Sequence, residues 1–196
     1  MTMGSRIRLY HGSDVAIEHP DVTRNTGFAD LGQGFYLTDD HDAARRRAVS
    51  RARKTGTGAG VVSVFEFDED SLPWVTMGDQ LVAKNQVAVG ACGAMATCDG
   101  ASPFALRFAD DVAGIRSWIE YIMACRADRT EVDALGSPAV VRAWIATEEV
   151  ELVNSGLLSA DEVVGYIDPS ELIVQYCLTD QRVVDASLHF VAAESA

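Results

Sequence analysis

The sequence has no run of apolar residues long enough to cross a bilayer, which takes about 20 residues in a helix. Its first ten residues, MTMGSRIRLY, also lack the apolar stretch of a secretory signal peptide. We therefore expect a cytoplasmic protein with no membrane partner. Because 48% of the 196 residues are hydrophobic, the chain can bury a substantial core, and we expect a single domain over residues 1–196.

Cysteine is scarce and follows no ligand pattern. The four cysteines form no C-x-x-C pair and have no histidine at ligand spacing; they are Cys92, Cys98, Cys125 and Cys177. This argues against the common zinc motifs and against a disulfide framework. We expect free or buried thiols and no metal site.

Positive charge is also in short supply. Sixteen Lys and Arg face 29 Asp and Glu, which gives a formal net charge of -13. A protein that binds nucleic acid through its bulk charge normally needs a basic surface, so this class is disfavoured, although a nucleic acid remains possible as an acceptor. Six of the sixteen basic residues nonetheless lie in RRRAVSRARK, residues 45–54, so one local surface is positive.

A dinucleotide-binding fingerprint is absent. Gly32 and Gly34 have no third glycine at the required spacing, and a strand-like segment follows them where the fingerprint needs a helix. Elsewhere strand and helix patterns are interspersed without a regular βαβ alternation. We therefore expect an α+β fold and not a doubly wound sheet.

Four strands and four helices are expected from the residue patterns. The strands are residues 7–13, 32–38, 61–70 and 171–178, with a loop at 14–26 and only weak signals over 75–104. The helices are residues 40–55, 109–129, 137–158 and 159–167. Ser137 before Pro138 is typical of a helix start, and Ser159 three residues before Glu162 predicts a capping box.

Several motifs, taken in order, resemble a bacterial family of ADP-ribosyltransferase-like proteins. They are LYHGS, LGQGFYLTDDHDAA, VVSVFEFDED, WIEYIMACRADR and LIVQYCLTDQRVV. The family is usually described only as a domain of unknown function and is often encoded in toxin–antitoxin gene pairs. It is similar to the His-Tyr-Glu branch of NAD-consuming transferases, which includes the poly(ADP-ribose) polymerases. The resemblance implies a split β-sheet core with flanking helices.

The resemblance also implies an NAD site. His11 would bond a hydroxyl of the nicotinamide ribose, the backbone of Gly12 would hold the carboxamide with help from Ser13, and Tyr36 would stack on the nicotinamide ring. Gln175 falls where the polymerases have a glutamate. The central expectation is that the His11 and Tyr36 side chains face each other across one small pocket.

The chemistry of NAD cleavage suits these residue types. Breaking the bond between nicotinamide and ribose passes through an oxocarbenium-like cation, so the site must orient the ribose and tolerate positive charge. Tight turns at Gly12 and Gly34 let the backbone approach a ligand. Arg46, with its neighbours Arg45 and Arg47, and Arg126 are candidates for the pyrophosphate or for an acidic partner.

Structural roles compete with each of these assignments. His11 can be a strand-end residue bonded to backbone, Tyr36 can be a core aromatic, the arginines can form a solvated helix face, and Arg126 can interact with a helix dipole.

Gln175 departs from the polymerases because it cannot ionise, and a missing general base typically lowers a rate by about 10² to 10⁴. Polymer elongation is therefore not expected. Nearby carboxylates that can substitute, or that simply solvate the surface, are Asp168, Glu171, Glu148 and Glu149.

The leading hypothesis is a mono-ADP-ribosyltransferase that uses NAD as substrate, acts as the toxin of a toxin–antitoxin pair, and binds an antitoxin protein. A second is a non-catalytic module that binds NAD, a nucleotide or a protein. A third, ranked lower because positive charge is confined mainly to one helix, is an RNA 2'-phosphotransferase-like enzyme.

Overall fold

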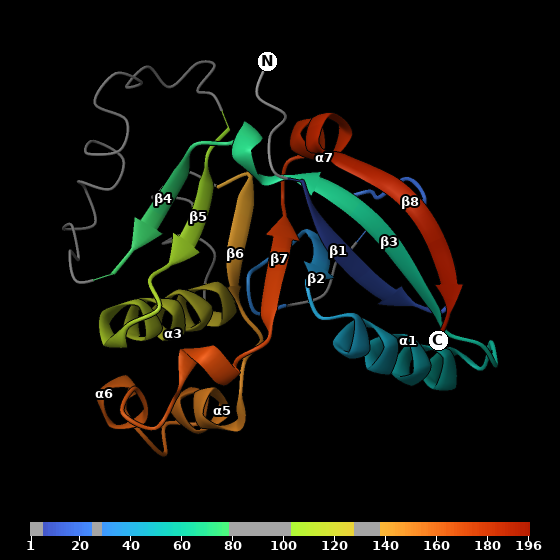
Figure 1. Cartoon of the computed structure of the whole chain (residues 1–196). Helices are drawn as coiled ribbons and strands as arrows, with labels where there is room; N and C mark the ends of the chain where they lie inside the picture. Colours follow the sequence, from blue (N-terminus) through green and yellow to red (C-terminus); the bar gives the residue numbers. More distant parts are fainter. Residues whose placement is uncertain (1–5, 25–28, 79–102, 128–137) are drawn as a thin grey trace.

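The structure, a computed structural model, describes residues 6–24, 29–78, 103–127 and 138–196 (Figure 1). Its strands are β1 Arg6–Ser13, β2 Phe35–Thr38, β3 Val61–Asp68, β4 Trp74–Met77, β5 Ala105–Phe108, β6 Val140–Trp144, β7 Val174–Leu178 and β8 Leu188–Ser195. Its helices are α1 His41–Thr55, α3 Val112–Ala127, α5 Glu148–Asn154, α6 Ala160–Val163 and α7 Gln181–Ser187, with short 3₁₀ turns η1 Glu69–Ser71 and η2 Pro169–Glu171.

The eight described strands form one mixed sheet in the order β4-β5-β6-β7-β2-β1-β3-β8. Strands β4, β5 and β6 run parallel to one another, and the remaining neighbours are antiparallel. The two halves of the sheet meet at the short strand β2, and they spread apart below it (Figure 1). The fold is thus mixed α and β without a doubly wound arrangement, as the interspersed pattern predicts.

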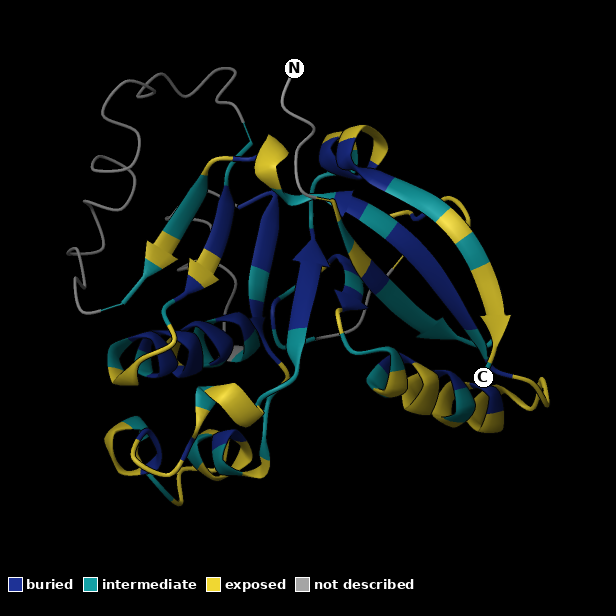
Figure 2. Ribbon diagram, in the orientation of Figure 1, coloured by how far each residue is buried: buried dark blue, intermediate teal, exposed yellow. Residues whose placement is uncertain are grey.

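The sheet has two different faces. One face packs against α1 through Ala44 and Ala48 and against α3 through a large apolar cluster that includes Trp118 and Ile122. The opposite face carries a second cluster that includes Phe65 and the α7 residue Val183. The central strands are almost entirely buried, and the outer side of α1 is exposed (Figure 2).

Helix α1 matches the helix expected at 40–55. Asp40 caps its start, because the Asp40 carboxylate accepts a hydrogen bond of 2.7 Å from the Ala43 N–H. Gly56 ends it in the left-handed conformation, with φ 74°. The buried positions between these caps are all alanine, which lets the helix lie close to β1.

The helix expected at 137–158 is wrong over its first part. Residues Val140–Trp144 form β6, a buried strand paired with β5 on one side and β7 on the other. Two adjacent valines and a tryptophan favour a strand, and two neighbouring strands outweigh local helix propensity. Only Glu148–Asn154 is helical, and Ser137 lies outside the described residues.

The end of the chain also differs from expectation. The strand expected at 171–178 begins at Val174, after the 3₁₀ turn η2, and it is not the last strand. Helix α7 and strand β8 follow it, and β8 pairs with β3 along an irregular register. The predicted capping box is confirmed, because Ser159 and Glu162 exchange hydrogen bonds at the start of α6.

Two smaller expectations concern helices and cysteines. None of the described helices is long and apolar enough to pass through a membrane. The thiols of Cys125 and Cys177 are buried, as expected, whereas Cys92 and Cys98 lie outside the described residues.

Candidate functional site

Strand register places Tyr36 and Gln175 on one face of the sheet. Tyr36 lies opposite Cys177, and Thr38 lies opposite both Gln175 on β7 and Tyr10 on β1. Residues that pair across antiparallel strands point to the same face, and so do alternate residues of one strand. This is the face covered by α1 and α3, because Tyr36 packs on the α3 cluster and Tyr10 on the α1 cluster.

Strands β1 and β2 stop pairing just before His11. Their register consists of Tyr10 opposite Thr38, whereas β1 continues to pair with β3 through His11, Gly12 and Ser13. The edge of β1 that faces β2 therefore extends past the last paired residue. A backbone edge of this kind offers hydrogen-bonding groups to a ligand that carries an amide.

The His11 imidazole lies at the point where β1 and β2 separate, and it contacts the β2 backbone there. Its Nδ1 lies 2.7 Å from the backbone carbonyl oxygen of Tyr36. Because a carbonyl only accepts, Nδ1 carries the proton and Nε2 is left with its lone pair in the neutral ring. Burial lowers the pKa of His11, and the positive charges of Arg47 and Arg51 lower it further, while the bond to Tyr36 opposes them. The ring is thus held neutral, in the tautomer whose Nε2 accepts a hydrogen bond.

The expectation that the His11 and Tyr36 rings face each other is not met. The His11 ring stacks on Phe35, with 4.5 Å between ring centroids, and Phe35 belongs to the cluster on the α7 face. Tyr36 is the next residue of β2, so its side chain points to the opposite face. The contact between the two residues is the bond from the imidazole to the Tyr36 backbone.

The Tyr36 hydroxyl is engaged within the protein. It donates a 2.6 Å hydrogen bond to the Gly32 carbonyl and accepts one of 3.1 Å from the Leu31 N–H. Burial, with the neighbouring Cys177, raises its pKa far above the usual range. Tyr36 therefore stays protonated and anchors the loop that precedes β2.

Both predicted glycines sit where backbone segments touch. A Cβ on Gly12 would lie 1.9 Å from the Ala44 carbonyl oxygen, and one on Gly34 would lie 2.6 Å from the Leu178 oxygen. Packing of α1 on β1, and of β2 on β7, thus accounts for both residues. Ser13 donates to the Asp14 carboxylate at 3.2 Å, close to Arg51, whose Nε is 3.7 Å from Asp14.

Gln175 is buried, and its side chain is used internally. The Gln175 amide nitrogen donates a 2.9 Å hydrogen bond to the Trp144 carbonyl on β6. The other carboxylates considered for this role have structural contacts or lie at the surface. Asp168 caps η2 by accepting from the Ser170 N–H, and a bond from Thr147 lowers the pKa of Glu149. Glu148 and Glu171 are exposed.

The arginines of α1 divide between two sides of the helix. Arg46 lies with Arg45 on the outer side, over a shallow concave surface that Arg53 and Lys54 share. Arg47 and Arg51, four residues apart and so on one side of the helix, are the pair whose charge reaches His11. Sequence reasoning selected Arg46 and missed Arg51; the four-residue spacing was the available signal.

Arg126 of α3 forms ion pairs with the loop before β2 and with α5. Its guanidinium lies 2.6 Å from the Asp30 carboxylate and 2.7 Å from the Glu151 carboxylate of α5. Burial lowers the pKa of Arg126, but the hydrogen bonds that its guanidinium donates to both carboxylates outweigh this effect and raise the pKa. Asp30 precedes Leu31, so Arg126 fixes the loop that receives the Tyr36 hydroxyl. Its charge is already balanced by protein groups, which disfavours a role in binding pyrophosphate.

Comparison with protein families matches residues 7–81 to a family described as "Protein of unknown function (DUF3990)". This stretch runs from β1 to β4 and covers well under half of the 196 residues. It contains His11, Gly12 and Tyr36 but not Gln175 or Arg126. No curated protein and no solved structure matches the chain.

Proposed function

We propose that the protein is an NAD-dependent mono-ADP-ribosyltransferase built on an ADP-ribosyltransferase-like fold. The observation that carries the proposal is the neutral His11 ring, whose Nδ1 is committed to the Tyr36 carbonyl at the point where β1 leaves β2. A fixed acceptor beside a strand edge that no longer pairs with β2 suits a ribose hydroxyl next to a carboxamide.

Within this proposal the chain's residues take the following roles. His11 Nε2 accepts a hydrogen bond from a hydroxyl of the nicotinamide ribose. The β1 edge at Gly12 and Ser13 bonds the carboxamide through backbone groups. Arg47 and Arg51, whose charges lower the pKa of His11, replace Arg46 as candidates for the pyrophosphate, and Arg51 also pairs with Asp14.

The reaction breaks the bond between the ribose C1 and the nicotinamide nitrogen, and nicotinamide leaves with the electron pair. The acceptor's nucleophilic atom then bonds C1 and gives up its proton to solvent or to a carboxylate. Gln175 cannot take that proton, because its amide does not ionise and its nitrogen is bonded to Trp144. A slow single transfer is therefore expected, without elongation of a polymer.

As a biological role we propose the toxin of a toxin–antitoxin pair that acts on a macromolecular or small acceptor. Its expected partner is an antitoxin protein. This role rests on the sequence motifs.

A non-catalytic binding module is the second candidate, and two observations favour it. The Gln175 amide and the Arg126 guanidinium are both already bonded to protein groups. Such a module predicts NAD or partner binding without nicotinamide release.

One experiment separates the candidates. Purified protein is incubated with NAD labelled in the adenylate part, with and without cell lysate, and both nicotinamide release and label transfer are measured. The proposal predicts both signals, and their loss in His11→Ala with retention in Arg46→Gln. Binding of NAD by calorimetry without either signal supports a module that binds NAD. The absence of NAD binding, nicotinamide release and label transfer overturns the transferase and leaves only a module whose ligand is a different nucleotide or a protein.

A further inference from the structure

The outer side of α1 is the strongest concentration of positive charge in the chain. Helix α1 carries six basic residues and one acidic residue, a formal charge of +5, on a protein whose net charge is -13. The rest of the chain therefore carries -18. A patch of opposite sign on so acidic a protein attracts anionic groups locally.

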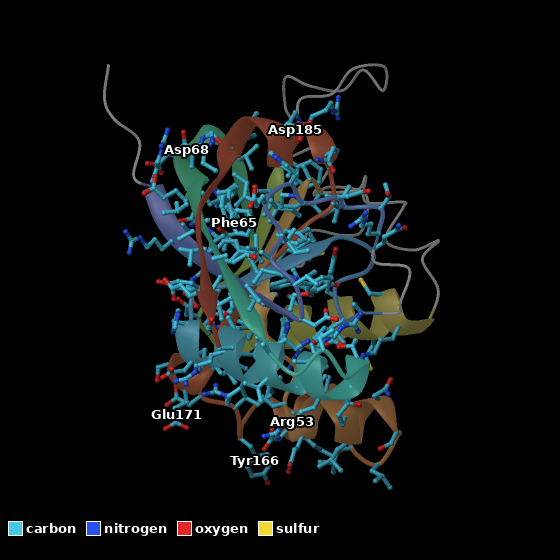
Figure 3. The ribbon with its side chains drawn as sticks, turned by 90° about the vertical axis from the view of Figure 1, so that its right-hand side faces the viewer. Arg53, Phe65, Asp68, Tyr166, Glu171 and Asp185 are labelled. Carbon is cyan, nitrogen blue, oxygen red and sulfur yellow. The ribbon has the colours of Figure 1, made fainter. Side chains whose placement is uncertain are left out.

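The charges on this surface have no partners within the described part of the chain. Arg45, Arg46, Arg53 and Lys54 are exposed, and none of them forms an ion pair with a described residue. Arg53 points away from the sheet (Figure 3). The four side chains border one shallow concave surface, together with Val49, Ser50 and one carboxylate, Asp42, so that cations outnumber anions there by four to one.

The chemistry of the surface favours phosphates. Three of its four cations are arginines, whose planar guanidinium binds a phosphate through two parallel hydrogen bonds. From Arg45 to Lys54 the helix rises about 14 Å, at 1.5 Å per residue, which is about four phosphates of one nucleic acid strand at 3.4 Å each.

A protein partner fits this surface less well. Protein interfaces are centred on buried aromatic or apolar anchors, and this surface offers only the half-buried Val49. Binding through phosphates needs no such anchor. The acidic remainder of the chain acts weakly on a ligand held here, because charge effects in water decay within about 8 Å at physiological salt.

We infer that the outer side of α1 binds the phosphate backbone of a nucleic acid. The inference stands independently of the proposed transferase activity, because it concerns binding in the absence of NAD. Binding is electrostatic, independent of base sequence and strongly dependent on salt.

The test is fluorescence anisotropy with the full chain and no NAD. The probes are a 20-nucleotide single-stranded RNA, a 20-base-pair DNA duplex and a 20-residue polyglutamate, each labelled with fluorescein. For four phosphate contacts we expect log–log salt slopes of about -3 for the single strand and about -3.5 for the duplex. A slope of -3 means about 60-fold weaker binding at 200 mM than at 50 mM salt.

Three variants identify the surface. Replacing Arg45, Arg46, Arg53 and Lys54 by glutamine keeps a good helix former at each position and should weaken binding at least tenfold. The control replaces four exposed arginines elsewhere by glutamine and should stay within twofold of the parent protein; they are Arg6, Arg8, Arg24 and Arg182. Changing Arg45, Arg46 and Arg53 to lysine should retain the salt slope.

Four results would overturn the inference. They are no oligonucleotide binding at 50 mM salt, an equal loss in the α1 and control variants, a full loss in the lysine variant, and polyglutamate binding as tight as that of RNA. The last would point to an acidic protein segment. Circular dichroism of each variant verifies that the helix is retained.

Discussion

Replacing Gly12 by alanine tests the packing that positions the candidate site. An alanine Cβ would lie 1.9 Å from the Ala44 carbonyl oxygen and 2.8 Å from the Ala48 nitrogen. Real Cβ contacts are not found below 3.0 Å, so α1 would have to move by about 1 Å or β1 would have to bend. Both obstacles are backbone atoms of a helix that is capped at its two ends, so no side-chain rotation relieves the clash.

The expected cost follows from overpacking. Inserting a methyl group into a well-packed site costs about 1–3 kcal/mol, and the Gly12 clash with backbone belongs at the upper end. At about 2–4 °C per kcal/mol for a domain of this size, we expect the melting temperature to fall by about 6–12 °C.

The assay is thermal and urea unfolding followed by circular dichroism. The matched control is Gly165→Ala, because a Cβ at Gly165 has no atom within 4 Å. That variant should stay within about 0.5 kcal/mol of the parent protein. If Gly12→Ala were as stable as Gly165→Ala, the result would contradict the close packing of the α1 backbone on Gly12 of β1.

Three further predictions concern the neighbouring polar groups. Gln175→Leu should lower the free energy of unfolding by about 1–3 kcal/mol, because the buried Trp144 carbonyl loses its donor. Urea unfolding measures this loss, and an unchanged midpoint would contradict the hydrogen bond between Gln175 and Trp144. Arg126→Leu should lower the free energy of unfolding by about 1–3 kcal/mol, because the Asp30 and Glu151 carboxylates lose their cation. Amide hydrogen exchange in the loop before β2 should become faster. Unchanged exchange would contradict the role of Arg126 in holding that loop. The folded state lowers the pKa of His11 below 6.5, so the unfolded chain binds more protons than the folded chain at acidic pH. His11 should therefore leave the free energy of unfolding unaffected well above pH 6.5 and lower it as the pH falls below that value. A titration of the imidazole by NMR should give a midpoint below 6.5, with the proton on Nδ1 in the neutral form, and a midpoint above 6.5 would contradict the burial.

Local signals predicted the elements whose ends are fixed by side chains. The Asp40 cap and Gly56 define α1, and Ser159 with Glu162 defines the start of α6. Alternation of large residues was sufficient for β1 and β3. These features depend on residues close together in the chain, so sequence alone contains them.

Features that depend on distant neighbours escaped prediction. The valines of β6 were assigned to a helix because their pairing with β5 and β7 is invisible locally. The arrangement of the candidate site was also not predictable from the sequence. The sequence analysis expected the His11 and Tyr36 rings to face each other, but strand alternation turns them to opposite faces of the sheet.

Charge partners were equally hidden in the sequence. Arg126 looked available for a ligand, yet Asp30 and Glu151 come from two other segments to balance it. The choice between Arg46 and Arg47 depends on which side of α1 packs on the sheet, and that is decided by the buried alanine stripe.

A crystal structure of the protein with a non-hydrolysable NAD analogue tests the central claim most directly. The account predicts a ribose hydroxyl within hydrogen-bonding distance of His11 Nε2, while Nδ1 keeps its bond to the Tyr36 carbonyl, and the carboxamide on the backbone of Gly12. An analogue that binds away from the point where β1 and β2 separate, or a protein that takes up none at millimolar concentration, would contradict the account.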